Sequence, residues 1–145
     1  VIMVSVIPNY TSQKLLDWDA GLDAHLKNIS GRDEKRKVRE EYRKKFPPPA
    51  VLLKDVAAHM EYIRRLIGVD HVGIGADFYG DGDSVDDMKD VSGYPKLIAE
   101  LVKLGWSAEE IKKAAGLNVL RVLKQNEEIA RELQKQSVPS EVMME

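Results

Sequence analysis

The sequence predicts an α/β fold with two parallel strands, and three observations support this prediction. Residues 1–7 (VIMVSVI) are rich in β-branched side chains and end at Pro8-Asn9, a turn signal. Residues 72–76 (VGIGA) form an apolar run that leads into a loop rich in glycine and aspartate, as a buried strand does. A helix is predicted between them, from Asp55 to Leu66, by its apolar stripe. A strand, a helix and a strand in this order form a β-α-β unit, which requires parallel pairing.

The second predicted strand ends in a single carboxylate, Asp77. Side chains on a strand alternate between its two faces, so Gly73, Gly75 and Asp77 share one face. The two glycines are expected to leave open space on that face. Ligands of parallel α/β folds bind at the carboxyl ends of the strands. Asp77 is therefore a candidate functional residue, and the alternative is that it caps the loop that follows.

The composition limits the class of protein. The chain has 145 residues, no cysteine and a net charge of −2. The lack of cysteine excludes disulfides and thiolate metal sites, and the charge argues against a nucleic-acid partner that needs a basic surface. No apolar run is long enough for a transmembrane segment. The chain opens directly in a predicted strand, without a methionine, and we expect it to be a piece of a longer protein.

A dense run of charges follows a predicted helix that begins at Gln13, after Thr11 or Ser12 as the cap, and ends near Gly31. The run, residues 32–45 (RDEKRKVREEYRKK), has eight basic and four acidic side chains, a local net charge of +4.

This run has two interpretations. It is either a surface that binds RNA, phospholipid or an acidic partner, or a solvated helix with ion pairs such as Glu40 with Lys44 and Glu41 with Lys45. We favour the solvated helix, because mixed signs and a single aromatic residue make a poor nucleic-acid surface. The sequence Phe46-Pro47-Pro48-Pro49 is expected to end the helix.

The rest of the chain is predicted to be mostly helical. A helix is expected from Tyr94 to Leu104, and Ser107 with Glu110 forms a capping box that starts another. A last helix, from Asn118 to about Gln134, is expected to pack its apolar side chains, which are Leu120, Val122, Leu123, Ile129 and Leu133.

Common catalytic and metal-binding motifs are absent. The chain has no GxxxxGK loop and no GxSxG elbow. Its three histidines, His25, His59 and His71, show neither HxH nor HxxxH spacing, and His59 is interpreted as a packing residue of its helix. The aspartate-rich loop from Asp81 to Asp90 fails the EF-hand pattern, which leaves weak calcium binding as an alternative.

Three motifs carry a resemblance to a known family. They are residues 73–80 (GIGADFYG), residues 90–95 (DVSGYP) and residues 116–122 (GLNVLRV). In this order they resemble the C-terminal part of the membrane (renal) dipeptidase family, whose pattern there is roughly GIGxDFDG, DVSxYP and G-x-N-x-LRV. The resemblance covers about Leu53 to Leu123, and residues 1–12 match the preceding strand.

The resemblance implies the C-terminal portion of a (β/α)8 TIM-type barrel, with the two strands as the seventh and eighth. Residues 1–136 would be the C-terminal part of one barrel domain, in which residues 14–50 form a charged helical insertion with a proline spacer. Residues 137–145 are expected to be a disordered tail.

The resemblance also implies an activity, the hydrolysis of dipeptides with two zinc ions as cofactor. Asp77 matches the family's active-site aspartate, which takes part in substrate binding and proton transfer, and Tyr10 aligns with a tyrosine that lines the substrate pocket. The family's metal ligands lie on earlier strands: a His-x-Asp pair, a glutamate and two further histidines. None of those positions falls in this chain, so the chain alone is expected to be inactive.

Two departures from the family pattern leave the substrate preference open. Tyr79 stands where the family usually has an aspartate, and Ser5 replaces a common asparagine. A dipeptide is the expected substrate, with a related hydrolase of another amide as an alternative. A second alternative is a non-catalytic homologue in which residues 32–45 bind a partner. A homodimer is left open.

Overall fold

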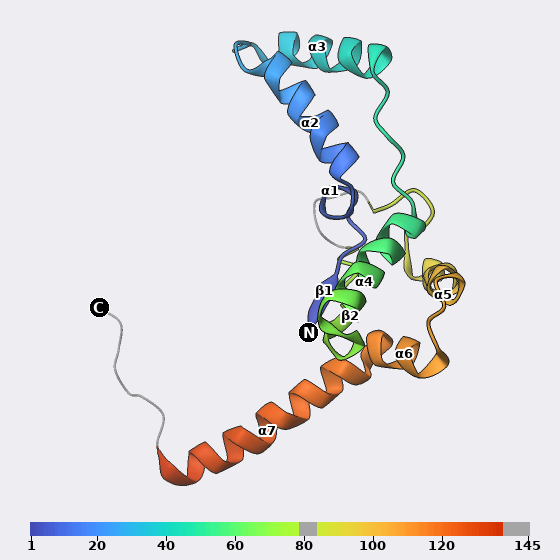
Figure 1. Cartoon of the computed structure of the whole chain (residues 1–145). Coiled ribbons are helices and arrows are strands. Elements are labelled where there is room, and N and C mark those ends of the chain that lie inside the picture. The colour runs from blue at the N-terminus through green and yellow to red at the C-terminus, as the bar shows by residue number, and fades with distance from the viewer. Residues whose placement is uncertain (79–83, 138–145) are drawn as a thin grey trace.

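The computed structural model describes residues 1–78 and 84–137, and it is mostly helical around a small parallel sheet (Figure 1). Strand β1 (Ile2–Val4) pairs in parallel with β2 (Val72–Ile74), and Met3 lies opposite Gly73. The predicted β-α-β connection is therefore confirmed, although both strands are shorter than predicted.

The helices follow the predicted order closely. Their bounds are α1 (Pro8–Thr11), α2 (Gln13–Leu26), α3 (Arg32–Lys45), α4 (Leu53–Ile67), α5 (Tyr94–Lys103), α6 (Ala108–Lys112) and α7 (Asn118–Gln136). Short 3-10 turns span Val69–His71 and Val91–Gly93, and a π-helical turn, Lys113–Leu117, joins α6 to α7. Ser12 caps α2 as expected, but α2 ends five residues before Gly31, and the predicted Pro8-Asn9 turn is part of α1.

The core lies where α4 packs against the sheet and α5 packs against α4. Its largest fully buried side chains are Leu53, Met60, Met88, Leu97, Leu101, Val6, Val56, Val72 and Val85. Removing such a side chain from water stabilises the fold by roughly 2 kcal/mol. The amide of Val85 donates to the Val6 carbonyl (3.0 Å), so the chain at Val85 lies beside the segment that follows β1.

The glycines of β2 face a neighbouring side chain, not open space. A Cβ at Gly75 would lie 2.9 Å from the Met3 Cβ, and a Cβ at Gly73 would overlap the Met3 sulfur. The expectation of an open face along β2 is therefore wrong. Parallel pairing in register places Met3 against this face, so the glycines allow the two strands to fit together.

Helices α2 and α3 form a hairpin that extends away from the sheet, and we call it the arm (Figure 1). Aromatic rings hold its two helices together, with centroids 5.4 Å apart for Trp18 and Tyr42 and 5.1 Å apart for Tyr42 and Phe46. The Trp18 indole also donates to the Phe46 carbonyl (2.8 Å). The arm is therefore held together by its own contacts. The prolines that follow Phe46 end α3, as predicted.

Helix α7 extends in the opposite direction (Figure 1). Its first residue is anchored, because the Asn118 amide donates to the carbonyls of Val69 (2.7 Å) and Val72 (2.8 Å). Beyond that point Leu120, Leu123, Ile129 and Leu133 are exposed, and Val122 is half-buried. The predicted packing of α7 is therefore wrong for these four exposed side chains, because no other described element lies over the distal part of the helix.

Among the residues that the structure describes, no helix is both long and apolar enough to cross a membrane. The predicted tail, residues 137–145, lies outside the described residues except for Ser137.

Candidate functional site

Asp77 follows the carboxyl end of β2, three residues after Ile74, where the end of the apolar run predicts it. Its side chain is exposed, whereas the preceding Ala76 is buried and the following Phe78 packs edge-on against Tyr94, with centroids 6.1 Å apart. The backbone of Asp77 has a φ of 61°, in the left-handed region that few side chains adopt. Strained backbone of this kind is concentrated at functional sites, and the anchored neighbours hold it here.

Tyr10 lies in α1, just after the carboxyl end of β1, and is 68% exposed. Because β1 and β2 are parallel, Tyr10 and Asp77 both follow the same edge of the sheet. The structure thus brings the two predicted site residues to one edge, although no contact between their side chains is recorded among the described residues.

Tyr10 borders a cavity of about 650 Å³ at this edge, between the base of the arm and the loop after β2. Four charged side chains line it: Arg43 from α3, Asp19 from α2, and Asp86 and Lys89 from the loop. The amide of Asn9 donates to Asp19 (2.7 Å), and the Lys89 ammonium donates to the Ser84 carbonyl (2.6 Å). Sequence reasoning missed these residues, because only the fold of the arm brings α2, α3 and this loop together.

A second cavity, of about 660 Å³, lies on another side of Tyr10 and is lined in part by His59 and Tyr62 of α4. His59 is half-buried beside the core stripe of its helix. Tyr10 therefore borders two hollows.

The described acids of the aspartate-rich loop have structural partners. Asp87 accepts a hydrogen bond from the Leu53 amide (2.8 Å), and Asp86 lies 3.6 Å from the Lys89 ammonium. Asp90 accepts from the Ser92 amide (2.8 Å), and hydrogen bonds from the side chain and backbone of Ser92 lower the pKa of Asp90. These carboxylates hold the loop together. Asp81 and Asp83 lie outside the described residues, and so does Tyr79, which stands where the family usually has an aspartate.

No metal site is formed by the part of the chain that the structure describes. No group of three or more His, Cys, Asp or Glu side chains is placed to hold an ion there. Asp77 and Tyr10 thus follow the same end of the sheet, and no metal centre is formed beside them among the described residues.

The comparisons with known proteins identify the family. The description "Membrane dipeptidase (Peptidase family M19)" belongs to the family profile that matches residues 1–137. The chain belongs to this family, and the resemblance of its three motifs is confirmed.

Among curated relatives, the chain is 49% identical over 75 residues to dipeptidase ataJ of Aspergillus terreus, a match over 52% of this chain and 18% of the relative. It is 42% identical over 82 residues to human dipeptidase 3, over 57% of this chain and 17% of the relative. The chain therefore spans about a fifth of the length of these relatives.

A solved structure supports the same relationship. The crystal structure of the probable dipeptidase PvdM from Pseudomonas aeruginosa superposes with a TM-score of 0.59 at 30% identity, over 83% of this chain and 36% of that chain. The α/β fold described above is thus shared with part of a larger protein.

Proposed function

We propose that the chain is the C-terminal segment of a dipeptidase and that the whole protein hydrolyses the peptide bond of dipeptides. The proposal rests mainly on Asp77, an exposed carboxylate with a left-handed backbone conformation just after the carboxyl end of β2. Membership of the dipeptidase family and the relatives named dipeptidases support this proposal. In this proposal β1 and β2 are the seventh and eighth strands of a TIM-type barrel, whose edges the rest of the protein covers.

Asp77 would move a proton during hydrolysis. One of its carboxylate oxygens accepts a proton from the attacking water and passes it to the nitrogen of the leaving amine as the peptide bond breaks. The carboxylate ends each cycle ionised, because the proton that it accepts leaves with the amine. Tyr10 would line the pocket on the neighbouring strand, where its exposed ring contacts the substrate.

The family is generally zinc-dependent, but the described residues do not fit a zinc centre, because no cluster of ligands is formed among them. We propose that the ligands lie in the part of the whole protein that precedes this chain. This chain would then be inactive alone, and its contribution would be Asp77 and Tyr10.

The test is the substitution Asp77→Asn in the whole protein. Asparagine keeps the shape of the side chain and tolerates the left-handed backbone, but it cannot accept the proton. We expect turnover of dipeptides to fall by a factor of about 10² to 10⁴, while the metal content measured by atomic absorption stays the same. Equal loss of metal and turnover would indicate a ligand role, and unchanged turnover would show that Asp77 does not move the proton. No turnover of dipeptides by the unaltered whole protein would favour a non-catalytic homologue.

The substrate class is tested separately by comparing dipeptides with N-acyl amino acids at equal concentration. Turnover of the dipeptides alone supports the proposal. Turnover of only the acylated amino acids would assign the protein to the related amide hydrolases instead.

A further inference from the structure

The arm carries its arginines on one side of α3. Arg32, Arg36, Arg39 and Arg43 are separated by four, three and four residues, so they fall within an arc of about 60° on a helix of 3.6 residues per turn. All four are exposed, and we call them the arginine flank. The helical spacing places the acids of α3 outside this arc, and they are Asp33, Glu34, Glu40 and Glu41.

Acidic side chains of α3 neutralise little of the positive charge of the arginine flank. The predicted pairs of Glu40 with Lys44 and of Glu41 with Lys45 are not formed among the described residues. In α3 the structure instead gives one ion pair, from Arg36 to Asp33 at 3.5 Å, with both side chains more than two thirds exposed. Such a pair contributes little to stability. Ion pairing along α3 therefore does not account for the arginines.

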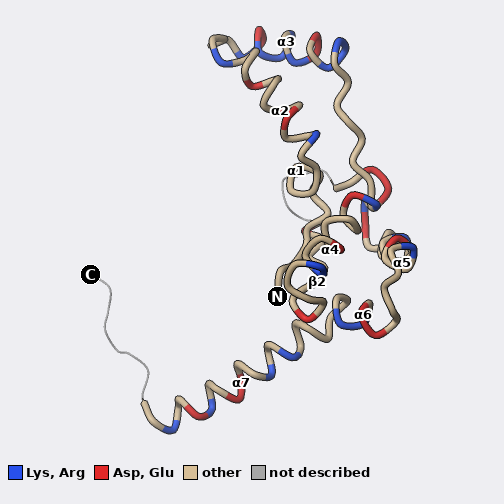
Figure 2. The backbone as a smooth tube through the Cα atoms, in the orientation of Figure 1, with Lys and Arg blue, Asp and Glu red and all other residues tan. Residues whose placement is uncertain are grey.

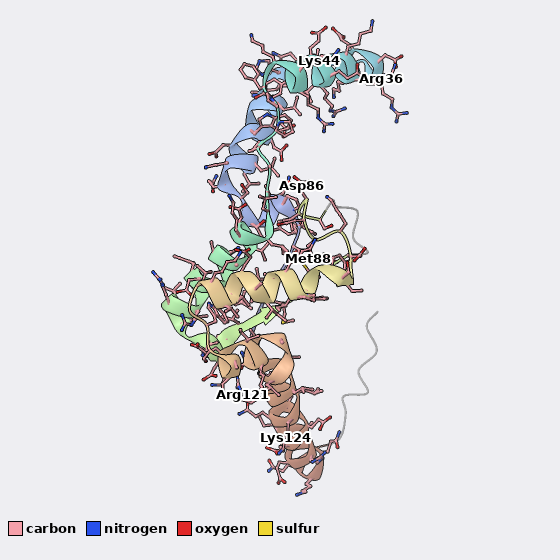
Figure 3. All side chains as sticks on the ribbon, turned by 90° about the vertical axis from the view of Figure 1, so that its right-hand side faces the viewer. Arg36, Lys44, Asp86, Met88, Arg121 and Lys124 are labelled. Atoms are coloured by element: carbon pink, nitrogen blue, oxygen red, sulfur yellow. The ribbon has the colours of Figure 1, made fainter. Side chains whose placement is uncertain are left out.

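More cations stand beside the flank. A groove of about 510 Å³ between α2 and α3 is lined by Lys27, Lys35 and Arg39, with Asp23 as its carboxylate. The arm extends away from the sheet, and much of the backbone tube of α3 is coloured blue for Lys and Arg (Figure 2). Arg36 and Lys44 both lie on this distant part of the molecule (Figure 3).

The shape of the surface is preformed. Tyr42 packs against Trp18, His25 and Phe46, so α3 is fixed on α2 by rings that face inward. A partner would therefore meet arginines on an already ordered helix, and binding would not have to order the backbone.

We propose that the arginine flank docks an acidic polypeptide segment, which pairs its carboxylates with the guanidinium groups. Arginine binds carboxylates through two parallel hydrogen bonds, and a helix with acids at the same spacing can lie alongside α3. A lipid surface is a poorer match, because Tyr42 turns inward and the flank itself presents no apolar side chain to insert. A single-stranded nucleic acid is a poorer match too, because Tyr42 is engaged with other rings and no base can stack on it.

The test measures binding of a fluorescent helical peptide, with glutamates four, three and four residues apart, to the whole protein by anisotropy. Reversing three arginines of the flank, in R32E/R36E/R39E, should weaken binding about tenfold or more, since repulsion replaces attraction. The matched control, K37E/K44E/K45E, reverses the same number of charges on other sides of α3 and should weaken binding far less. Circular dichroism checks that both variants remain folded.

Further probes separate the alternatives. A peptide with glutamine in place of glutamate should not bind, and added salt should weaken binding of the glutamate peptide. Equal weakening by both triple variants, or no binding at low salt, would overturn the proposal. Tighter binding of phosphatidylserine vesicles or of single-stranded RNA than of the peptide would also overturn it. Dipeptide hydrolysis by R32E/R36E/R39E should remain unchanged, so this test is independent of the proposed activity.

Discussion

The indole nitrogen of Trp106 donates a 2.7 Å hydrogen bond to the carboxylate of Glu61, a charged group that is only 7% exposed. Arg65 (2.6 Å) and Arg64 (3.1 Å) satisfy the same carboxylate. Arg64 also reaches Glu110 of α6 (2.7 Å) and lies over the Trp106 ring at 5.3 Å. This network ties α4 to the start of α6 through one buried acid.

Replacing Glu61 with glutamine should destabilise the protein by about 1–3 kcal/mol, because the neutral amide cannot hold two arginines and the buried donors lose their acceptor. Urea denaturation of the wild type and the variant gives this difference. Glu109→Gln is the matched control, since Glu109 pairs with Lys112 at the exposed surface and its loss should change the free energy of unfolding little. Equal effects of the two substitutions would contradict a special role for Glu61.

Stability should also fall at acidic pH, because two carboxylates of the network are held ionised. Hydrogen bonds from the Ser107 amide and Arg64 lower the pKa of Glu110 from 4.5 to about 2. Burial alone would raise the pKa of Glu61, but hydrogen bonds from Arg65, Trp106 and Arg64 outweigh it and lower that pKa.

Because the folded state lowers these pKa values, the carboxylates stabilise the protein above about pH 4.5, and that stability is lost as the pH falls towards about 2. Urea denaturation at a series of pH values measures the loss. Glu110→Gln should make the pH dependence shallower, since one of the two titrating groups is gone. An unchanged dependence would mean that other acids control the acid transition.

Local features of the fold could be predicted from the sequence because a few neighbouring residues determine them. Ser107 and Glu110 form the expected capping box, in which the Ser107 amide donates to Glu110 (2.8 Å). Helix α4 ends at Ile67, one residue after the predicted end at Leu66, and Gly68 with a φ of 91° follows it. The position of Asp77 after β2 could also be predicted, because the end of an apolar run depends only on adjacent residues.

Features that join distant parts of the chain could not be predicted from pattern. Glu61 and Trp106 are 45 residues apart, and no periodicity links them. Arg43 and Asp19 line one cavity only because the arm folds back on itself. The open face expected along β2 was wrong for the same reason, since it depended on which residue of β1 lies opposite.

Contact with Met3 should set the free-energy cost of replacing Gly73 or Gly75 with alanine. A Cβ at Gly73 would meet the movable end of the Met3 side chain, so Gly73→Ala should cost less than about 1 kcal/mol, and Met3→Ala should relieve that cost. A Cβ at Gly75 would meet the Met3 Cβ, so Gly75→Ala should cost about 1–3 kcal/mol, and Met3→Ala should not relieve it. A double-mutant cycle in urea measures both couplings. Rescue of Gly75→Ala by Met3→Ala would contradict the parallel register.

The exposed apolar side of α7 should make this chain self-associate when it is produced alone. Ile129 and Leu133 are one turn apart on the helix, and their side chains are 59% and 55% exposed. Introducing lysines in I129K/L133K should lower the sedimentation-equilibrium mass towards that of a monomer, because charge on this stripe opposes its burial. The control E128K adds the same two positive charges about 100° around the helix from Ile129 and about 140° from Leu133, so it should change the mass little. Self-association that survives I129K/L133K would point instead to the unpaired edges of β1 and β2, which in the proposed barrel are covered by the neighbouring strands.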